Sequence, residues 1–285
     1  MAVAVTGLGA VCAAGLSVPR LWQAVIDGHS GLTWCPHVRA ALARIHEPLA
    51  AEIDGIALHR ADRAVRLASM AASQILDPLR RAPAAPERVG VVLGTSRGPI
   101  DTWARSSRLA ASGERQPPTF LVQGTLASLS GTVSLLAQAQ GPSFTVSSTC
   151  ASAAHAIAIA ADLIESGAID LAITGGADAP LDPVILEQFR AVGLLGTHDD
   201  LALACRPFDR SRNGTVLGEG AGVLLLESLS SARRRGMQPL ALVQGWAMTC
   251  DAAGRASIEE DGRGLRRAIE LALARAGAGP SEIGY

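Results

Sequence analysis

One stretch of this chain, from Gly141 to Gly176, restricts the fold more than any other part of the sequence. Residues 144–147 alternate between apolar and small polar side chains, which is typical of a short strand. From 150 to 166 no glycine or proline interrupts an alanine-rich run, so the pattern predicts a helix of about four turns that ends at Gly167. Residues 169–174 are almost wholly apolar and precede two glycines, as in a buried parallel strand.

This order places Cys150 where the first strand ends and the helix begins. Unpaired N–H groups and the positive end of the helix dipole favour a thiolate at such a position. The neighbouring side chains of Thr149, Ala151 and Ser152 are small and leave room for a substrate carbonyl. This local pattern alone leaves two readings open, a nucleophilic cysteine or a buried cysteine that only fills space.

The composition excludes several classes of function. With 285 residues, 48% of them hydrophobic, and 30 glycines, the chain is expected to form one large α/β domain or two closely packed halves. A net charge of −1 gives no reason to expect binding to nucleic acid or to a membrane surface. The sequence contains no lysine, which rules out a Walker phosphate loop and a Schiff-base lysine. No apolar run reaches the ~18 residues of a membrane span, so we expect a soluble cytoplasmic protein.

Neither a cofactor nor a metal is indicated by the motifs. Gly7-Leu8-Gly9 lacks the third glycine and the acidic residue of a dinucleotide-binding fingerprint. The five cysteines are scattered without a CxxC pair, and His37 and His46 beside Cys35 fit no zinc spacing. We therefore expect no cofactor and no metal site.

Three motifs together resemble a known family. STCASAAHAI around Cys150, IDLAITGGAD after it and RPFDRSRNGTVLGEGAGVLLLE from residue 206 to 227 are similar to the β-ketoacyl synthases, condensing enzymes with a thiolase-like fold. The resemblance implies an α/β fold of layered αβαβα type, built from two pseudo-symmetric βαβαβαββ halves. It also implies that Cys150 carries the acyl group during elongation on acyl carrier protein.

The same resemblance predicts how the chain is divided. Residues 1–228 correspond to the family's N-terminal half with the nucleophile, and residues 229–285 to the beginning of a C-terminal half that we expect to be truncated here. The family's two catalytic histidines stand in motifs that this sequence lacks. The histidines present are His29, His37, His46, His59, His155 and His198. We expect His155 to be a packed interior residue.

The resemblance further implies protein partners. Arg60, Arg63 and Arg66 lie about one turn apart on a helix predicted over residues 61–76, capped by Asp62, where the family carries basic residues that meet the acidic carrier protein. A solvated helix face is the alternative. Family members dimerise through the strand before the nucleophile, here residues 143–147, so we expect a homodimer or a heterodimer with another ketosynthase chain.

Three functional readings remain. The chain is the N-terminal portion of a β-ketoacyl synthase that catalyses decarboxylative Claisen condensation in fatty acid or polyketide synthesis, with residues supplied from elsewhere. Alternatively it is a non-catalytic partner subunit, like a chain-length factor, although the retained Cys150 favours the first reading. The third reading is a thiolase-superfamily acyltransferase that uses Cys150 for acyl transfer only.

Other segments carry structural predictions. Residues 88–94 are read as a buried strand, 33–48 as an irregular surface loop and 105–118 as a polar loop. Residues 119–139 are read as a helix broken at Gly124 and Gly131, and 206–222 as a glycine-dense hairpin that leads into a strand. The family resemblance implies that this hairpin segment lies against the nucleophile's strand and shapes the pocket floor. Trp22, Ala24 and Val25 are expected to form the inner face of an early helix.

Overall fold

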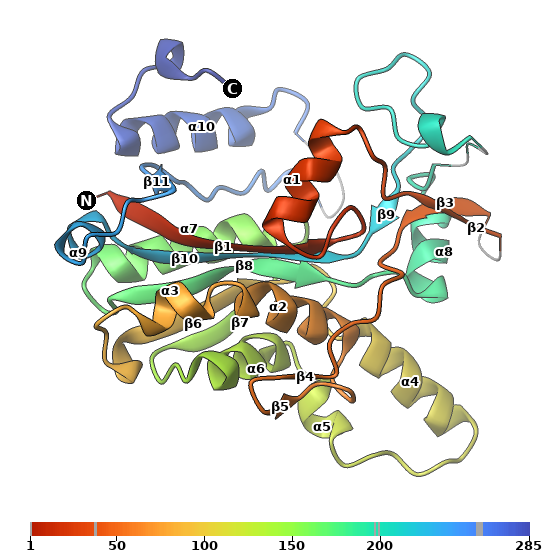
Figure 1. Ribbon diagram of the computed structural model, residues 1–285. Helices are drawn as coiled ribbons and strands as arrows, with labels where there is room; N and C mark the ends of the chain where they lie inside the picture. The colour runs from red at the N-terminus through yellow and green to blue at the C-terminus, as the bar shows by residue number, and fades with distance from the viewer. Residues whose placement is uncertain (1, 37–38, 197, 199, 255–258) are drawn as a thin grey trace.

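A six-stranded mixed sheet forms the centre of the computed structural model, which describes residues 2–36, 39–196, 198, 200–254 and 259–285 (Figure 1). The strand order is β11-β1-β10-β8-β6-β7, so β7 lies at an edge. The strands are β1 (Val3–Cys12), β6 (Val89–Gly94), β7 (Ser143–Val146), β8 (Leu171–Asp178), β10 (Gly220–Ser228) and β11 (Ala241–Val243). The predicted strands at 88–94, 144–147 and 169–174 are therefore confirmed.

The sheet is parallel only at the edge formed by β8, β6 and β7. β6 runs parallel to both β7 and β8, with Val92 opposite Phe144 and Leu93 opposite Gly175. β10 runs antiparallel to β8 and to β1, and β1 is antiparallel to β11. Because the carboxyl ends of parallel strands meet at one edge, the segments that follow β6, β7 and β8 come together there.

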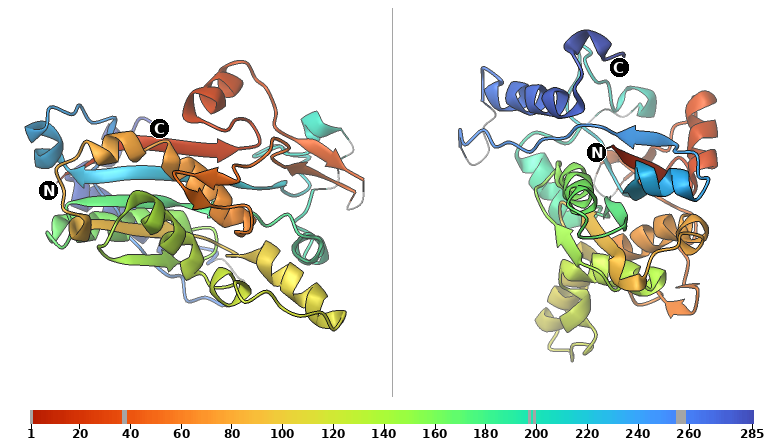
Figure 2. Two further views of the ribbon diagram at one scale, coloured as in Figure 1. Left: turned by 60° about the horizontal axis from the view of Figure 1, so that its bottom comes forward. Right: turned by 90° about the vertical axis from the view of Figure 1, so that its left-hand side faces the viewer.

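Helices cover both faces of the sheet (Figure 2). On one face α2 (Arg63–Ser73) and α6 (Ala127–Ala137) cover odd-numbered positions of β6, β8 and β10, including Val91 and Ile173. On the other face α7 (Ser152–Glu165) packs on Val92 and Ala172 through its alanines. This alternation gives a helix, sheet and helix arrangement, in which the alanine-rich composition of α7 allows the helix to approach the strands closely.

The segment after β10 packs on the outer side of α7. Trp246 donates through Nε1 to Asp162 at 3.0 Å, and Arg275 of α10 (Arg263–Ala276) bonds to the same carboxylate at 2.7 Å. The Arg275 guanidinium lies 3.5 Å from the centroid of the Trp246 ring system, a cation–π contact. In both figures α10 lies on the opposite side of the molecule from α4 (Ile100–Ala111) and α5 (Phe120–Gln123).

The remaining elements are short. They are α1 (Val18–Ile26), β2 (Thr33–Cys35), β3 (Ala40–Ala43), β4 (Glu52–Ile53), β5 (Ile56–Ala57), α3 (Leu76–Arg80), α8 (Pro183–Ala191), β9 (Leu217–Gly218), α9 (Leu229–Arg234), and the single 3₁₀ turns Pro86–Arg88, Leu201–Leu203 and Pro280–Glu282. The predicted end of the long helix is confirmed, because Gly167 has a left-handed φ of +72°.

Two segments predicted as loops are ordered elements. Residues 100–111 form α4, and only Thr102 on this helix is buried, so no apolar stripe marks it in the sequence. Asp62, which caps α2 through the N–H of Ala64, also accepts the N–H of Thr102 at 2.8 Å and so holds the start of α4. Residues 33–48 contain β2 and β3, which form a small sheet with β9 because Ala40–Leu42 are buried.

Two helix predictions are partly wrong. The helix over 119–139 is interrupted at Gly124 as predicted, but Gly131 lies inside α6 without breaking it. On α1 only Ala24 is buried, whereas Trp22 and Val25 are 64% and 61% exposed. The side chains of Trp22 and Val25 therefore point away from the body of the molecule, and Ala24 is the buried residue of this helix.

Candidate active site

Cys150 lies in a tight turn between β7 and α7. The turn begins as β7 ends at Val146, and Thr149 adopts a left-handed φ of +50°. Such a conformation costs about 1 kcal/mol or more in a residue with a β-branched side chain, and strain of this kind is typical of functional sites. The Cys150 side chain is exposed at the start of the helix, which agrees with the predicted strand–turn–helix order.

The hydroxyl of Ser152 fastens this turn. Its Oγ accepts the N–H of Ser148 at 2.9 Å and lies within donor distance of two carbonyl oxygens, 3.0 Å from Thr95 and 2.6 Å from Thr149. Thr95 directly follows β6. The buried side chain of Ser152, two residues after Cys150, therefore joins the end of β6 to the turn that follows β7. The backbone around Cys150 is thereby held in one geometry.

Glycines under the turn allow the backbones to approach each other. A Cβ on Gly94 would lie 2.3 Å from the carbonyl carbon of Ser152, and one on Gly176 would lie 2.7 Å from the oxygen of Gly94. A Cβ on Gly175, whose φ is +130°, would lie 2.1 Å from the oxygen of Gly222. These glycines therefore let the strand ends and the start of α7 lie closer together than residues with a Cβ would allow.

Beside the thiol is a cavity of about 500 Å³. It is bounded by the ends of β6 and β8, by α8 and by the first residues of β10. Its side chains include, besides Cys150, the polar residues Ser96, Arg97, Thr149, Asp178 and Thr215 and the apolar residues Pro180, Phe189 and Leu217. A pocket that is mostly apolar with a few polar groups and an exposed thiol can hold an acyl thioester.

Asp178 organises the rim of this cavity. Its carboxylate, at the end of β8, accepts the hydroxyl of Thr95 at 2.9 Å and the N–H groups of Ser96 and Arg97 at 2.9 and 3.0 Å. These bonds fix the loop that follows β6. Asp178 and this loop were not predicted as site residues. The signal that could have identified them is their position at the carboxyl ends of two parallel strands, the same sheet edge at which Cys150 lies.

His155 does not face the cavity. Its Nδ1 lies 2.8 Å from Oγ of Ser148, and its ring is half-buried on α7. Among the described residues that line the cavity there is no histidine, and His37 lies outside the described residues. The pocket beside Cys150 thus holds the thiol without an imidazole, as far as the described part of the chain shows.

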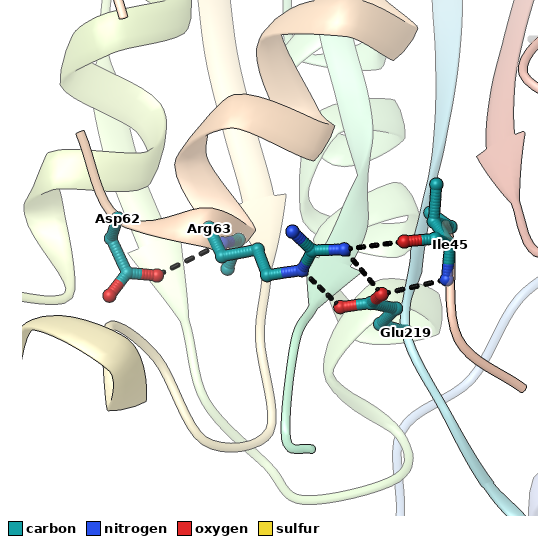
Figure 3. A network of polar contacts seen from close by, with 5 residues as sticks. Ile45, Asp62, Arg63 and Glu219 are labelled. Atoms are coloured by element: carbon teal, nitrogen blue, oxygen red, sulfur yellow. Dashed lines mark hydrogen bonds and ion pairs between the residues drawn. The ribbon is translucent and has the colours of Figure 1, made fainter. Parts of the chain in front are cut away.

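Arg63 has an internal partner. Its Nη2 lies 2.7 Å from Oε1 of Glu219, whose side chain is 1% exposed, and donates to the carbonyl of Ile45 at 2.9 Å (Figure 3). Glu219 also accepts the N–H of Ile45 at 2.8 Å. The bond to Glu219 raises the pKa of the Arg63 guanidinium. The pair joins α2 to the turn between β9 and β10, consistent with a structural Glu219.

The two other arginines of this group differ from each other. Arg66 donates to the carbonyls of Leu49 and Ala50, at 2.6 and 3.3 Å, and so braces the segment before β4. Arg60 precedes the helix and is exposed. Of the three, Arg60 is the one whose exposed position suits contact with another protein, and the carrier-binding role of the group stays a prediction.

Within the described ranges, no cluster of three or more His, Cys, Asp or Glu side chains is placed to hold a metal ion. In the same part of the chain, no helix has both the length and the apolar character needed to cross a bilayer.

Comparison with known proteins identifies the family. The model of the β-ketoacyl synthase N-terminal domain matches residues 1–232. The chain belongs to the β-ketoacyl synthase family.

Curated relatives of this ketosynthase chain come from two kinds of pathway. It is 31% identical to 3-oxoacyl-[acyl-carrier-protein] synthase 2 of Staphylococcus aureus, over 99% of this chain and 71% of the relative. It is 34% identical to the tetracenomycin polyketide synthase ketoacyl synthase alpha subunit of Streptomyces glaucescens, again over 99% of this chain and 71% of the relative. The chain therefore spans about 71% of the length of these condensing enzymes.

Solved structures show the same thiolase-like fold. The ishigamide ketosynthase/chain length factor superposes with a TM-score of 0.89 at 28% identity, over 99% of this chain and 71% of that one. A β-ketoacyl synthase from Burkholderia phymatum has a TM-score of 0.89 at 26% identity, and the match covers 100% of this chain and 72% of that one. The complex AntDE:AntF, described as an acyl-carrier protein with its ketosynthase, has a TM-score of 0.87 at 26% identity. This match also covers 100% of this chain and 72% of that one.

One expectation about the ketosynthase motif at 206–227 is wrong in detail. β10 pairs with β8 and not with β7, so two strands separate it from the strand that leads to the nucleophile. The segment nevertheless reaches the cavity, because Thr215, Leu217 and residues 220–222 line it. Its contact with the site is therefore made at the end of the sheet and not by strand pairing.

Proposed function

We propose that Cys150 accepts an acyl group from a carrier-protein thioester, as the first half-reaction of a β-ketoacyl synthase. The observation that carries this proposal is the exposed thiol on a strained strand–helix turn that opens into a cavity of about 500 Å³. The matched family and the condensing enzymes among its relatives support the same activity.

The acylation is a thiol exchange. The Cys150 sulfur adds to the thioester carbonyl and gives a tetrahedral oxyanion. When this collapses, the bond to the donor sulfur breaks, and the donor leaves as a thiol that carries the proton lost from Cys150. The N–H groups of Ala151 and Ser152 already bond to the carbonyls of Ser148 and Thr149, so the N–H of Cys150 itself is the donor that this turn offers to the oxyanion. Because a free thiol is required, the cytoplasm, where thiols stay reduced, is the compartment that suits this activity.

Condensation requires a second step. A malonyl thioester loses its carboxyl group as CO₂, and the resulting enolate attacks the acyl carbon, forming a carbon–carbon bond and releasing the Cys150 thiol. The enolate and the new oxyanion need hydrogen-bond donors opposite Cys150. Since the described lining of the cavity contains no imidazole, we infer that these donors come from polypeptide beyond the residues that line it here.

The same proposal divides the chain into two parts. Residues 1–228 act as the N-terminal half with the nucleophile, and residues 229–285 begin the second half. The packing of Trp246 and Arg275 on α7 supports this assignment, since it covers the face of α7 turned away from the sheet. The exposed Trp22 and Val25 of α1 and Leu265 and Ile269 of α10 are apolar surface that further polypeptide would bury.

A partner chain belongs to the same proposal. β7 is one of the two edge strands of the sheet, and Phe144 on it is 37% exposed, so residues 143–147 can pair with a second ketosynthase-type chain. Homodimers and heterodimers both fit. The ketosynthase/chain length factor structures among the neighbours favour the alternative that this chain pairs with a complete synthase as a non-catalytic subunit. The exposed thiol favours the catalytic role.

Intact-protein mass spectrometry tests the proposal. The full chain is incubated with an acyl-carrier-protein thioester, beside Cys150→Ala and the control Cys205→Ala, whose thiol is also exposed but lies outside the cavity lining. We expect one acyl adduct that is lost in Cys150→Ala and retained in Cys205→Ala. A folded wild-type chain that gains no adduct would favour the partner-subunit reading.

A further inference from the structure

A charged side chain shares the cavity with the nucleophile. Arg97 lines the same space as Cys150, although the rest of the lining is mostly apolar. A guanidinium has five N–H donors and remains charged at physiological pH. Its presence beside an acyl-accepting thiol therefore bears on which acyl groups the cavity accepts.

The position of Arg97 is fixed by its backbone. Its N–H donates to Asp178 at 3.0 Å, and the next residue, Gly98, has a left-handed φ of +68° and donates its N–H to the hydroxyl of Thr95 at 3.0 Å. The loop that presents Arg97 is thus tied to the ends of both β6 and β8. The side chain is aimed from a rigid base and not from a free loop.

The guanidinium rests on an aromatic ring. The Arg97 carbon Cζ lies 5.6 Å from the centroid of the Phe189 ring on α8, which lines the same cavity. Stacking of this kind holds the planar group while its N–H edges stay available for a planar anion. Among the described residues, no carboxylate forms an ion pair with Arg97.

The nearest carboxylate along the rim is otherwise engaged. Asp178 accepts two backbone N–H groups and the Thr95 hydroxyl, so its charge is already stabilised by the loop. The backbone of Arg97 takes part in these bonds, and its guanidinium does not. The cavity therefore presents the Arg97 guanidinium beside Phe189, and no carboxylate of the described residues is paired with it.

We propose that Arg97 binds an anionic group of the thioester substrate while the reacting carbonyl lies at Cys150. The anion is a carboxylate at the far end of the acyl group or the phosphate of the arm that carries it, and both suit a guanidinium fork. This inference rests on the proposed acyl transfer at Cys150 and adds a substrate class to it. A purely apolar acyl chain would leave the fork without a partner.

The first test does not depend on acyl transfer. Two maleimides of equal length, anionic N-(2-carboxyethyl)maleimide and neutral N-propylmaleimide, are reacted with the full chain, and labelling is followed at each cysteine by peptide mass spectrometry. We expect the anionic probe to be favoured at Cys150 relative to the exposed Cys205. The preference should fall by up to about fivefold in Arg97→Met, whose side chain keeps the length but not the charge, and partly persist in Arg97→Lys.

Two results would overturn the inference. One is an unchanged preference at Cys150 in Arg97→Met. The other is that both maleimides label Cys150 faster by the same factor in Arg97→Met. That result would mean that the Arg97 side chain obstructs access to the thiol and does not bind an anion. The ratio at Cys205 serves as the internal control in every variant.

A second arm identifies the source of the anion. Succinyl and butyryl groups are offered to Cys150 as N-acetylcysteamine thioesters, which lack phosphate, and as phosphopantetheine thioesters. A succinyl preference on both carriers, lost in Arg97→Met, assigns the acyl carboxylate. A preference for phosphopantetheine with both acyl groups, lost in the same variant, assigns the phosphate. If no thioester acylates Cys150, acyl transfer is contradicted, while the maleimide ratio still decides the role of Arg97.

Discussion

The hydroxyl of Ser152 lies 3.0 Å from the carbonyl oxygen of Thr95, so the first turn of α7 is fastened to the end of β6 directly beneath Cys150. This contact joins a helix that local sequence specifies to a strand more than fifty residues earlier in the chain. The geometry of the thiol depends on it, because the same hydroxyl also accepts the N–H of Ser148 in the turn.

Replacing Ser152 by alanine should loosen this turn. The N–H of Ser148 loses its acceptor, and we expect the free energy of unfolding to fall by about 1–3 kcal/mol. Urea unfolding followed by circular dichroism measures the loss. Ser166→Ala, where an exposed hydroxyl bonds only to the Leu163 carbonyl, is the matched control and should change stability much less. Equal effects of the two substitutions would contradict the role given to Ser152.

A methyl group at residue 94 should be incompatible with this packing. The added Cβ would lie 2.3 Å from the Ser152 carbonyl carbon, so β6 and α7 must separate. We expect Gly94→Ala to destabilise the chain by several kcal/mol, roughly the upper end of overpacking costs. Gly131→Ala, inside α6 with nothing within 4 Å of the new Cβ, should be neutral or stabilise by up to about 1 kcal/mol. Thermal unfolding of both variants tests the contrast, and a folded, equally stable Gly94→Ala would overturn it.

Loss of Arg63 should be costly because its partner is buried. In Arg63→Ala the carboxylate of Glu219, 1% exposed, keeps only the N–H of Ile45. We expect a loss of about 3 kcal/mol in unfolding free energy. Arg80→Ala removes a pair with Asp54 in which both side chains are more than 40% exposed, and should cost about 1 kcal/mol or less. Denaturant midpoints that fall equally in both variants would show that the Arg63 pair is not structural.

The buried Glu227 should make stability sensitive to acid. Burial opposes its ionisation, but hydrogen bonds from Arg235, Thr6 and Ser231 outweigh burial and lower its pKa. A lowered pKa means that stability is fully present above the ordinary glutamate range and is lost as the pH falls through the folded-state value. Glu227→Gln, which does not titrate, should reduce the slope of unfolding free energy against pH below pH 4.5 by up to about 1.4 kcal/mol per unit. An unchanged slope would contradict this assignment.

Arg60 should contribute more to the binding of acyl carrier protein than Arg63 and Arg66 do. Its exposed charge is available to an acidic partner, whereas Arg63 and Arg66 are bonded internally. We expect Arg60→Glu to weaken binding of acyl carrier protein several-fold at low salt, and the difference to shrink as salt is raised. Arg233→Glu on α9, an equally exposed site at another end of the molecule, is the control in titration calorimetry. A carrier affinity that Arg60→Glu leaves unchanged would remove this residue from the interface.

Local sequence determined the helix and the strand that surround Cys150. The uninterrupted run from 150 to 166 and the apolar run before Gly175 predict α7 and β8, because helix propensity and strand burial are short-range properties. Cys150 therefore falls at a strand–helix junction by local pattern alone. The cap by Asp62 and the left-handed Gly167 were readable for the same reason.

Tertiary structure decided what surrounds the thiol. Arg97, Phe189 and Thr215 come from three distant segments, and only the order β10-β8-β6-β7 brings their loops to one sheet end. The exposed Trp22 of α1 shows the same limit of local sequence patterns. An apolar stripe on a helix indicates that the face can be buried, but it does not indicate which surface will bury it. Periodicity is set by neighbours in the chain, whereas strand order and cavity walls depend on contacts between residues far apart in sequence. For this reason the sequence by itself determined the local setting of the Cys150 thiol, and only the folded sheet determined the pocket into which it opens.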